Sequence, residues 1–223
     1  MPIHLMNLMG SPNIGVYCLA TDGLALIPTY VSKSKIQGIE KWLGARAIRM
    51  NIGGSILNGV LAVANSTGIV LPRFADSEDE EQLRSAGDFN VVRLDSKETA
   101  LGNLVLVNDL GGIYDPELPN SVVKVLHDAL GVEMVSSSIA RLHIVGALAV
   151  ANNKGAIAHP LLEDDERNIL EDVLKVPVTV GTTNGGVPFV KSGMLANNTV
   201  AFVGSYTTGP ELVIIGQALD LVD

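Results

Sequence analysis

The sequence predicts an α/β fold in which five short β/α repeats close into a ring. Two regularities lead to this prediction. Prolines recur every 44 residues, at Pro28, Pro72, Pro116 and Pro160, and one further step lands on Gly204. A turn signal precedes each of these positions, and helix-type periodicity follows most of them. Self-similarity at such a period is typical of repeat architectures, and units that bury only one face are stabilised by packing radially.

The first half of each repeat predicts a β-hairpin. Two apolar runs, such as 60–64 and 69–71, flank a turn that contains Asn, Asp or Gly. A glycine opens each first run, at Gly15, Gly59, Gly102, Gly146 and Gly193. We interpret these glycines as points of close packing around the axis, with Cys18 as a small core residue in a strand over 15–20. The asparagines that recur in the turns, explained by turn geometry, are Asn65, Asn108, Asn152 and Asn197.

The second half of each repeat predicts a helix and a final strand, so the unit is ββαβ. Ser77-x-x-Glu80 has the pattern of a capping box, and the acidic runs 76–81 and 163–166 suit the positive end of a helix. Apolar residues at helical spacing follow, as at Ile36, Ile39 and Leu43. The glycines placed to end three of these helices are Gly44, Gly87 and Gly131.

The repeats fill a single domain, at about 14–56, 57–100, 101–143, 144–190 and 191–223. The last repeat is too short to carry a strand after its helix. We expect the segment 1–10 to supply that strand, around 3–8, and so to close the ring. Closure within one chain removes the need for a second copy, so we expect a monomer.

Composition excludes several classes of protein. The 223 residues include 47% hydrophobic residues and carry a net charge of −9, from 15 Lys and Arg against 24 Asp and Glu. This chain is not a disordered tail, and it lacks the general basic charge that unspecific binding to DNA or RNA requires. The single cysteine, Cys18, excludes an intramolecular disulfide framework and a multi-cysteine metal site.

Signals for export or membrane insertion are not found in the sequence. The first ten residues contain no Lys or Arg, unlike the start of a signal peptide. The longest apolar run, about 144–151, falls far short of the roughly 20 residues of a membrane helix. We expect a cytoplasmic protein.

Common catalytic motifs are missing too. No two glycines stand two positions apart, no glycine precedes a Lys-Ser or Lys-Thr pair, and the four histidines show no metal-binding spacing. We therefore predict no catalytic residue, no cofactor and no metal site.

Several blocks of sequence resemble the translation initiation factor 6 family of archaea and eukaryotes. The resemblance covers nearly the whole chain in unbroken order. The blocks that carry it include Asn51-Ile52-Gly53-Gly54-Ser55, Ala100-Leu101-Gly102-Asn103, Asn108-Asp109, His159-Pro160-Leu161, Gly181-Thr182-x-Asn184-x-Gly186 and Thr207-Thr208-Gly209-Pro210-Glu211-Leu212. The chain ends soon after its last predicted helix, without the charged tail of eukaryotic members, so it looks archaeal.

The resemblance implies a pentein β/α-propeller, with five pseudosymmetric repeats around a central channel. It implies a non-enzymatic protein that binds the large (50S) ribosomal subunit on its intersubunit face and keeps the small subunit from joining, with roles in translation initiation and large-subunit biogenesis. The implied partners are a ribosomal protein next to the sarcin–ricin loop and nearby ribosomal RNA, with no DNA or membrane. Release would depend on a translocase-like GTPase and its partner protein.

Candidate ribosome-binding residues follow from this resemblance and from charge. Asn103 matches a family position implicated in subunit binding, and its alternative role is that of a turn residue. The other candidates near the repeat starts and turns are Gly102, Asn58, Val60 and Asn108. The first predicted helix adds Lys33, Lys35 and Lys41, which with Arg46 and Arg49 make five of the 15 cations within 17 positions. This cluster is either a solvated face or a contact for RNA phosphates.

Other functions stay open at this point. The pentein ring is shared with guanidine-modifying enzymes, which use a cysteine near the C-terminus, but the cysteine of this chain stands at position 18. The ring is also able to serve as a scaffold for an unrelated partner. Trp42 is expected to pack against the core or a sheet rather than to stack on a base.

Overall fold

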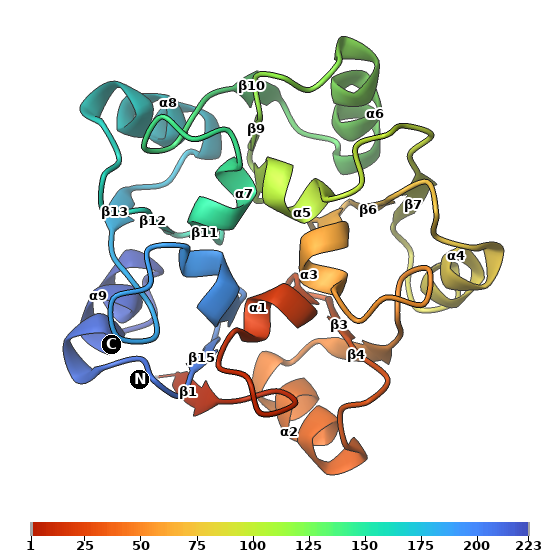
Figure 1. Cartoon of the computed structure of the whole chain (residues 1–223), viewed down its shortest axis with the longest axis horizontal. Coiled ribbons are helices and arrows are strands. Elements are labelled where there is room, and N and C mark those ends of the chain that lie inside the picture. Colours follow the sequence, from red (N-terminus) through yellow and green to blue (C-terminus); the bar gives the residue numbers. More distant parts are fainter. Residues whose placement is uncertain (1, 223) are drawn as a thin grey trace.

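A computed structural model describes residues 2–222. Five three-stranded sheets stand around a common axis, each with a long helix on its outer side and a short helical turn near the axis (Figure 1). The fold is therefore the predicted α/β ring of five pseudo-repeats, which is propeller-like.

The second repeat shows the order of elements. A one-turn helix, α3 (Asn58–Leu61), leads into β5 (Val63–Ala64), which pairs antiparallel with β6 (Gly68–Leu71). Helix α4 (Ser77–Arg84) then returns the chain to β7 (Asn90–Arg93), which pairs parallel with β6. The same order recurs in α1 (Ile14–Tyr17), β2 (Leu19–Ala20), β3 (Leu24–Ile27), α2 (Lys33–Leu43), β4 (Arg46–Arg49); in α5 (Leu101–Leu104), β8 (Val105–Val107), β9 (Gly112–Tyr114), α6 (Asn120–Leu130), β10 (Met134–Ser136); and in α7 (Val145–Leu148), β11 (Ala149–Ala151), β12 (Ala156–Ala158), α8 (Asp164–Leu174), β13 (Val178–Val180).

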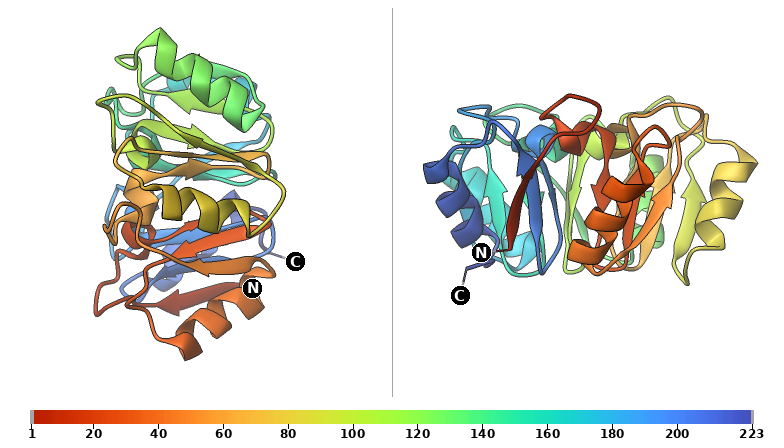
Figure 2. Two further views of the ribbon diagram at one scale, coloured as in Figure 1. Left: turned by 90° about the vertical axis from the view of Figure 1, so that its right-hand side faces the viewer. Right: turned by 90° about the horizontal axis from the view of Figure 1, so that it is seen from below.

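The fifth repeat is completed by the N-terminal strand. It contains the 3₁₀ turn η1 (Val190–Gly193), β14 (Met194–Ala196), β15 (Ala201–Gly204) and α9 (Gly209–Ala218). Its third strand is β1 (Ile3–Met6), which pairs parallel with β15 in the register Ile3↔Ala201. A strand from the beginning of the chain and a strand from its last repeat thus lie side by side in one sheet (Figure 2).

The ring has two faces that the topology distinguishes. The outer two strands of each sheet are parallel, so their carboxyl ends lie at the same edge. The short helical turns, the loops that lead into them and the loops that lead into the long helices therefore gather on one face. We call it the helix face. The hairpin turns gather on the opposite face, which we call the turn face.

The short helical turns correct the sequence-based prediction, which placed these residues in strands. Gly59 is the second residue of α3, and a Cβ there would overlap the carbonyl oxygens of Gly15 and Cys18 in the preceding repeat. Gly15, Gly102 and Gly146 are equally confined by backbone carbonyls, so only glycine fits at these four positions. Cys18 is buried at the carboxyl end of α1 rather than inside a strand.

Gly193 is not the fifth member of this set. In η1 the sequence Val190-Lys191-Ser192-Gly193 aligns with Val145-Gly146-Ala147-Leu148 of α7, so Lys191 occupies the glycine position.

The predicted helix signals also need correction in α4. Its N-cap is Asp76 rather than Ser77, with Asp79 as the reciprocal partner, and the helix ends at Arg84, before Gly87. Gly44 and Gly131 do cap α2 and α6 in the left-handed conformation.

The turn asparagines join the repeats to one another. The Asn108 side-chain oxygen accepts from the amides of Leu110 and Gly111, as turn geometry predicts. Its amide nitrogen donates to the carbonyls of Asn152 (3.0 Å) and Leu174 (2.9 Å) in the next repeat. Asn65 and Asn152 make the equivalent pair of bonds, and Asn197 makes one of them, to Leu43. These buried side chains latch each hairpin turn to the end of the following long helix.

The contact between the first and second repeats lacks this latch. Thr21 stands where the other repeats have Asn, and its hydroxyl only accepts from its own turn. Helix α4 is eight residues long against 10 or 11 in the other long helices, so it ends before reaching that turn. A cavity of about 450 Å³ lies between the two repeats, lined by residues that include Thr21, Asn65 and Phe89. Arg46 bridges part of this seam by donating to the Ala86 carbonyl (2.7 Å).

Candidate functional site

Asn103 lies on α5, near the axis on the helix face. Its backbone amide donates to the Ala100 carbonyl (2.9 Å), which closes the short turn. The residue is partly exposed, and its side-chain amide makes no hydrogen bond to any of residues 2–222. A carboxamide with all of its donors and acceptors free is suited to bind a partner's backbone or polar groups.

Asn58 is a structural asparagine, although it also belongs to a short helical turn. It is completely buried, its side-chain oxygen accepts from the Ile52 amide (3.2 Å), and its nitrogen donates to the Met50 carbonyl (2.9 Å). These contacts fix the loop that precedes α3 from beneath. Neither end of its amide is accessible, so the structure gives Asn58 an internal bonding role, and its predicted contact with a partner stays a prediction. Val60, on the same turn, is partly exposed on the helix face.

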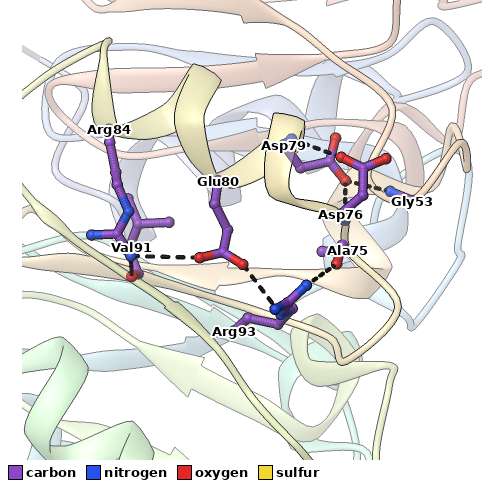
Figure 3. A network of polar contacts seen from close by, with 8 residues as sticks. All are labelled: Gly53, Ala75, Asp76, Asp79, Glu80, Arg84, Val91 and Arg93. Atoms are coloured by element: carbon purple, nitrogen blue, oxygen red, sulfur yellow. Dashed lines mark hydrogen bonds and ion pairs between the residues drawn. The ribbon is translucent and has the colours of Figure 1, made fainter.

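A recurrent clamp holds the loops that precede the short helical turns. Asp79, at the third position of α4, accepts from the Gly53 amide (2.7 Å) and completes the capping box with Asp76 (Figure 3). Glu166 of α8 accepts from the amides of Ala140 and Arg141 in the same way, and Glu211 of α9 accepts from Gly185 and Gly186. Each carboxylate thus satisfies one helix start and one helix-face loop.

The clamp is strongest electrostatically at Glu211. Burial raises the pKa of this carboxyl, but hydrogen bonds from Thr182 and from the amides of Thr208, Gly186 and Gly185 outweigh it and lower the pKa to about 2. The pKa of Glu166 is also lowered, since its hydrogen bonds outweigh the effect of burial. Glu80, the residue after Asp79 in α4, instead pairs with Arg84 (3.5 Å) and Arg93 (3.1 Å) on the outer side of the helix (Figure 3).

The repeat that carries Asn103 has no such clamp. The third position of α6 is Val122, and the α6 N-cap is Pro119, whose side chain accepts no hydrogen bond. The four other repeats have an isolated β-bridge in the loop before their short turn, while the loop 95–99 has none. This loop, Asp95-Ser96-Lys97-Glu98-Thr99, is polar and charged and leads directly to α5. Asn103 therefore stands on the least restrained edge of the helix face.

Large apolar side chains are exposed around the same face. They belong to the loops before the short turns and to the turns before the long helices. The set comprises Met9, Tyr30, Phe74, Leu142, Ile144, Leu161, Phe189 and Tyr206. Leu110 is an exposed residue of the turn face. Exposed apolar side chains gathered on one face are typical of a protein-binding surface.

Lys191 contacts the site from two repeats away. Its ammonium donates to the carbonyl of Gly102, the residue before Asn103. That carbonyl lies at the end of a one-turn helix, where no further backbone amide reaches it. Burial lowers the pKa of Lys191 to about 8. The sequence does not reveal this contact, because Gly193 resembles the counterpart of the other repeat glycines, whereas Lys191 occupies that position.

The basic candidates lie apart from Asn103, on the outer flank of the ring. Lys33, Lys35 and Lys41 are exposed on α2, which covers the first sheet (Figure 1). Lys35 holds the position of the clamp carboxylates, and its ammonium donates to the Asn7 carbonyl (2.7 Å). Asn108, another candidate for ribosome contact, is buried on the turn face, opposite the face that carries Asn103. Gly102 is buried behind Asn103.

Three further features of residues 2–222 bear on function, namely the thiol, the side chains able to ligate a metal and the length of the helices. Burial raises the pKa of the Cys18 thiol to about 12, so the reactive thiolate is disfavoured. The described residues contain no group of three or more His, Cys, Asp and Glu placed to hold a metal ion. None of the helices described between residues 2 and 222 has the length and hydropathy needed to cross a membrane.

Comparison with known proteins agrees with this fold and with the sequence blocks. The sequence profile of the eIF-6 family matches residues 3–218. The chain belongs to the eIF-6 family. Curated members named translation initiation factor 6 include one from Cenarchaeum symbiosum, 45% identical over 98% of this chain and 99% of the relative. The member from Aeropyrum pernix is 46% identical over 97% of this chain and 94% of its own length. The member from Methanocaldococcus jannaschii is 41% identical over 96% of both chains. Asn103 and its unclamped loop thus belong to an eIF-6 family ring.

Proposed function

We propose that this protein acts in translation initiation by binding the large (50S) ribosomal subunit through its helix face, which keeps the small subunit from joining. Membership of the eIF-6 family and the names of its archaeal relatives support the role in initiation. A broad ring face that carries apolar side chains supports steric obstruction, because a rigid ring on the intersubunit face would occupy the space of the other subunit.

The observation that carries the proposal is the free carboxamide of Asn103 beside the unclamped loop 95–99. The other short turns carry Val16, Val60, Ala147 or Ser192 at the same position, so ring symmetry does not account for an asparagine there. The partners that fit are a ribosomal protein next to the sarcin–ricin loop and the nearby ribosomal RNA. A role in large-subunit biogenesis and release by a translocase-like GTPase with its partner protein complete the proposal.

Sedimentation with separated archaeal ribosomal subunits tests the proposal. We expect the protein to move with the large subunit alone and to reduce joined ribosomes as it is added. Asn103→Ser should weaken co-sedimentation without changing the melting temperature. Gln217→Ser is the matched control, because Gln217 is an exposed carboxamide on the outer helix α9.

The same experiment separates the alternative of a scaffold for an unrelated partner. Protein that stays at the top of the gradient at low and at moderate salt would overturn ribosome binding. Equal binding by wild type and Asn103→Ser would remove Asn103 from the contact. A cytoplasmic monomer is the form in which we expect the protein to act.

We also propose that the protein is not an enzyme of the guanidine-modifying type. The supporting observation is the buried Cys18, whose raised pKa opposes the thiolate that such chemistry needs. Alkylation of the native protein at neutral pH should leave Cys18 unmodified. Rapid alkylation under these conditions would revive the enzymatic alternative.

A further inference from the structure

The outer flank of the first repeat concentrates positive charge on an acidic protein. Between residues 33 and 49 there are five cations and one acid, Glu40, whereas the whole chain carries −9. Arg46 and Arg49 use their guanidinium groups on backbone carbonyls of Ala86 and Thr29. The ammonium groups of Lys33 and Lys41 make no hydrogen bond or ion pair to any of residues 2–222. This flank is the part of the surface most suited to a polyanion.

Trp42 lies on this flank and is more than half exposed, at 55%. One face of the indole packs against a sheet, as expected, through strand β1, but the side chain does not lie in the core. Its indole rests on His4 of β1, with ring centroids 4.2 Å apart and an interplanar angle of 41°. His4 is in turn close to the ring of Phe202 (5.5 Å). The indole is thus supported from below, which holds its outer surface in place.

Gly38 leaves a bare surface next to this indole. It lies in the middle of α2, where glycine costs about 1 kcal/mol relative to alanine. A Cβ at Gly38 would meet no atom within 4 Å, so packing within the chain does not require glycine there. Residues three and four positions apart are neighbours on a helix, so Gly38 adjoins Lys35, Lys41 and Trp42. The result is an open ledge bordered by an aromatic ring and by two cations.

We propose that Trp42, Gly38 and Lys41 form a binding site for an unpaired nucleotide of single-stranded RNA. A base stacks on the outer face of the Trp42 indole and extends over Gly38, where no side chain stands in its way. A flanking phosphate lies near Lys41, which adjoins Gly38 on the helix. The inference rests on the proposed function only for the natural source of the RNA, which would be the large ribosomal subunit.

Base stacking distinguishes RNA from other polyanions. An acidic peptide would interact with the lysines, but it has no planar group to place over Trp42 and Gly38. Charge alone would not explain why the helix has a glycine beside an exposed tryptophan. The two features together favour a ligand that is both flat and anionic.

Trp42 is the only tryptophan of the chain, so its fluorescence reports directly on this site. Titration with a single-stranded eight-residue oligoadenylate at low salt should quench the fluorescence to saturation. The logarithm of the affinity should fall with the logarithm of salt concentration, by about 0.7 for each phosphate contacted. Polyglutamate of similar charge should give no comparable quenching.

Four variants locate the contact, with affinity measured by anisotropy of a labelled oligonucleotide. Trp42→Leu should weaken binding by roughly tenfold or more, because stacking is lost, and Trp42→Phe should retain part of it. Gly38→Ala should weaken binding several-fold while raising the melting temperature, since alanine favours the helix. Lys41→Ala should flatten the salt dependence. The control is Lys124→Ala, an exposed lysine on α6, which should behave as wild type.

The outcomes that would overturn the inference are also direct. One is the absence of quenching by the oligonucleotide at low salt, and another is equal quenching by polyglutamate. Unchanged affinity in both Trp42→Leu and Gly38→Ala would likewise exclude the site. Asn103→Ser should bind the oligonucleotide as wild type does, so a failure of subunit binding is distinguishable from a failure of this inference.

Discussion

The Lys191 ammonium donates a hydrogen bond to the Gly102 carbonyl from a non-adjacent repeat of the ring. Lys191 holds the position that is glycine in the other four short turns. Those glycines lie against backbone carbonyls, whereas the fifth repeat has a long side chain at this position. The side chain borders a small cavity of about 80 Å³ on the axis, lined also by Cys18 and Gly146. The carbonyl that it reaches precedes Asn103, so the fifth repeat supports the candidate contact residue of the third.

Titration of Lys191 should make stability depend on pH in the alkaline range. Its pKa is about 8 in the folded protein and 10.5 as its ordinary value, so the unfolded chain binds more protons between these pH values. The free energy of unfolding should therefore rise between pH 8 and 10.5, by at most about 3 kcal/mol. Chemical denaturation of wild type and Lys191→Met across this range checks the effect. If both proteins show the same pH dependence, the ammonium is not the group responsible.

Glu211 should give a dependence of the same sign in acid, with stability rising between pH 2 and 4.5. Its pKa falls from 4.5 to about 2 on folding, so its contribution is complete above pH 4.5 and is lost as the pH falls through 2. Glu211→Gln should lower the free energy of unfolding by about 3 kcal/mol at pH 7. The difference from wild type should shrink steadily below pH 4.5. A difference that persists undiminished to pH 2 would contradict the ionic character of this clamp.

The axial glycines should tolerate no side chain. Gly59→Ala places a methyl group on the carbonyl oxygens of Gly15 and Cys18, so neighbouring repeats must separate. We expect a loss of stability above about 3 kcal/mol, as for severe overpacking. Gly23→Ala is the matched control, because a Cβ at this turn glycine meets no atom within 4 Å. Thermal melting of the two variants compares them; a mild effect of Gly59→Ala would mean that the ring adapts to the methyl group.

The missing latch in the first repeat should be restorable. Thr21→Asn supplies an amide nitrogen toward the Asn65 carbonyl, while its oxygen keeps the two turn bonds. We expect a gain of about 1 kcal/mol, or roughly 2–4 °C in melting temperature for a chain of this size. The reverse change, Asn108→Thr, removes the bonds to Asn152 and Leu174 and should destabilise by more than that gain. A stabilising Asn108→Thr would refute the latch.

The repeats and their closure were accessible from the sequence because their signals are local. The 44-residue spacing of Pro28, Pro72, Pro116 and Pro160 sets the period, and the short fifth repeat requires a strand from elsewhere, which β1 supplies. The short helical turns were not accessible. The constraint on Gly59 comes from carbonyls of another repeat, and a glycine that opens an apolar run reads locally as the start of a strand.

The candidate site was only partly accessible for a similar reason. Asn103 and Asn58 have the same residue type in related positions, and only the burial of Asn58 against Met50 and Ile52 separates their roles. Trp42 has the helical spacing of a packed residue. In the structure only one face of its indole is covered, by His4 of β1, and the other face is exposed. The contact of Trp42 with His4 joins residues 38 positions apart, so no local pattern contains it.

The seam between the first and second repeats has a consequence for how the molecule comes apart. A belt of side-chain bonds on the turn face runs from Ser66 through Asp109, Asn153 and Asn198 to Asp22, and it stops there. The first and last described segments of the chain both belong to the fifth repeat, so this break in the belt lies at a different place on the circle. Opening at this break would turn the closed circle into an arc of five modules while every sheet stays whole. A circular permutant cut in the 21–24 turn would remove the covalent link between the paired strands β2 and β3, whereas transient opening at the seam breaks no strand pair.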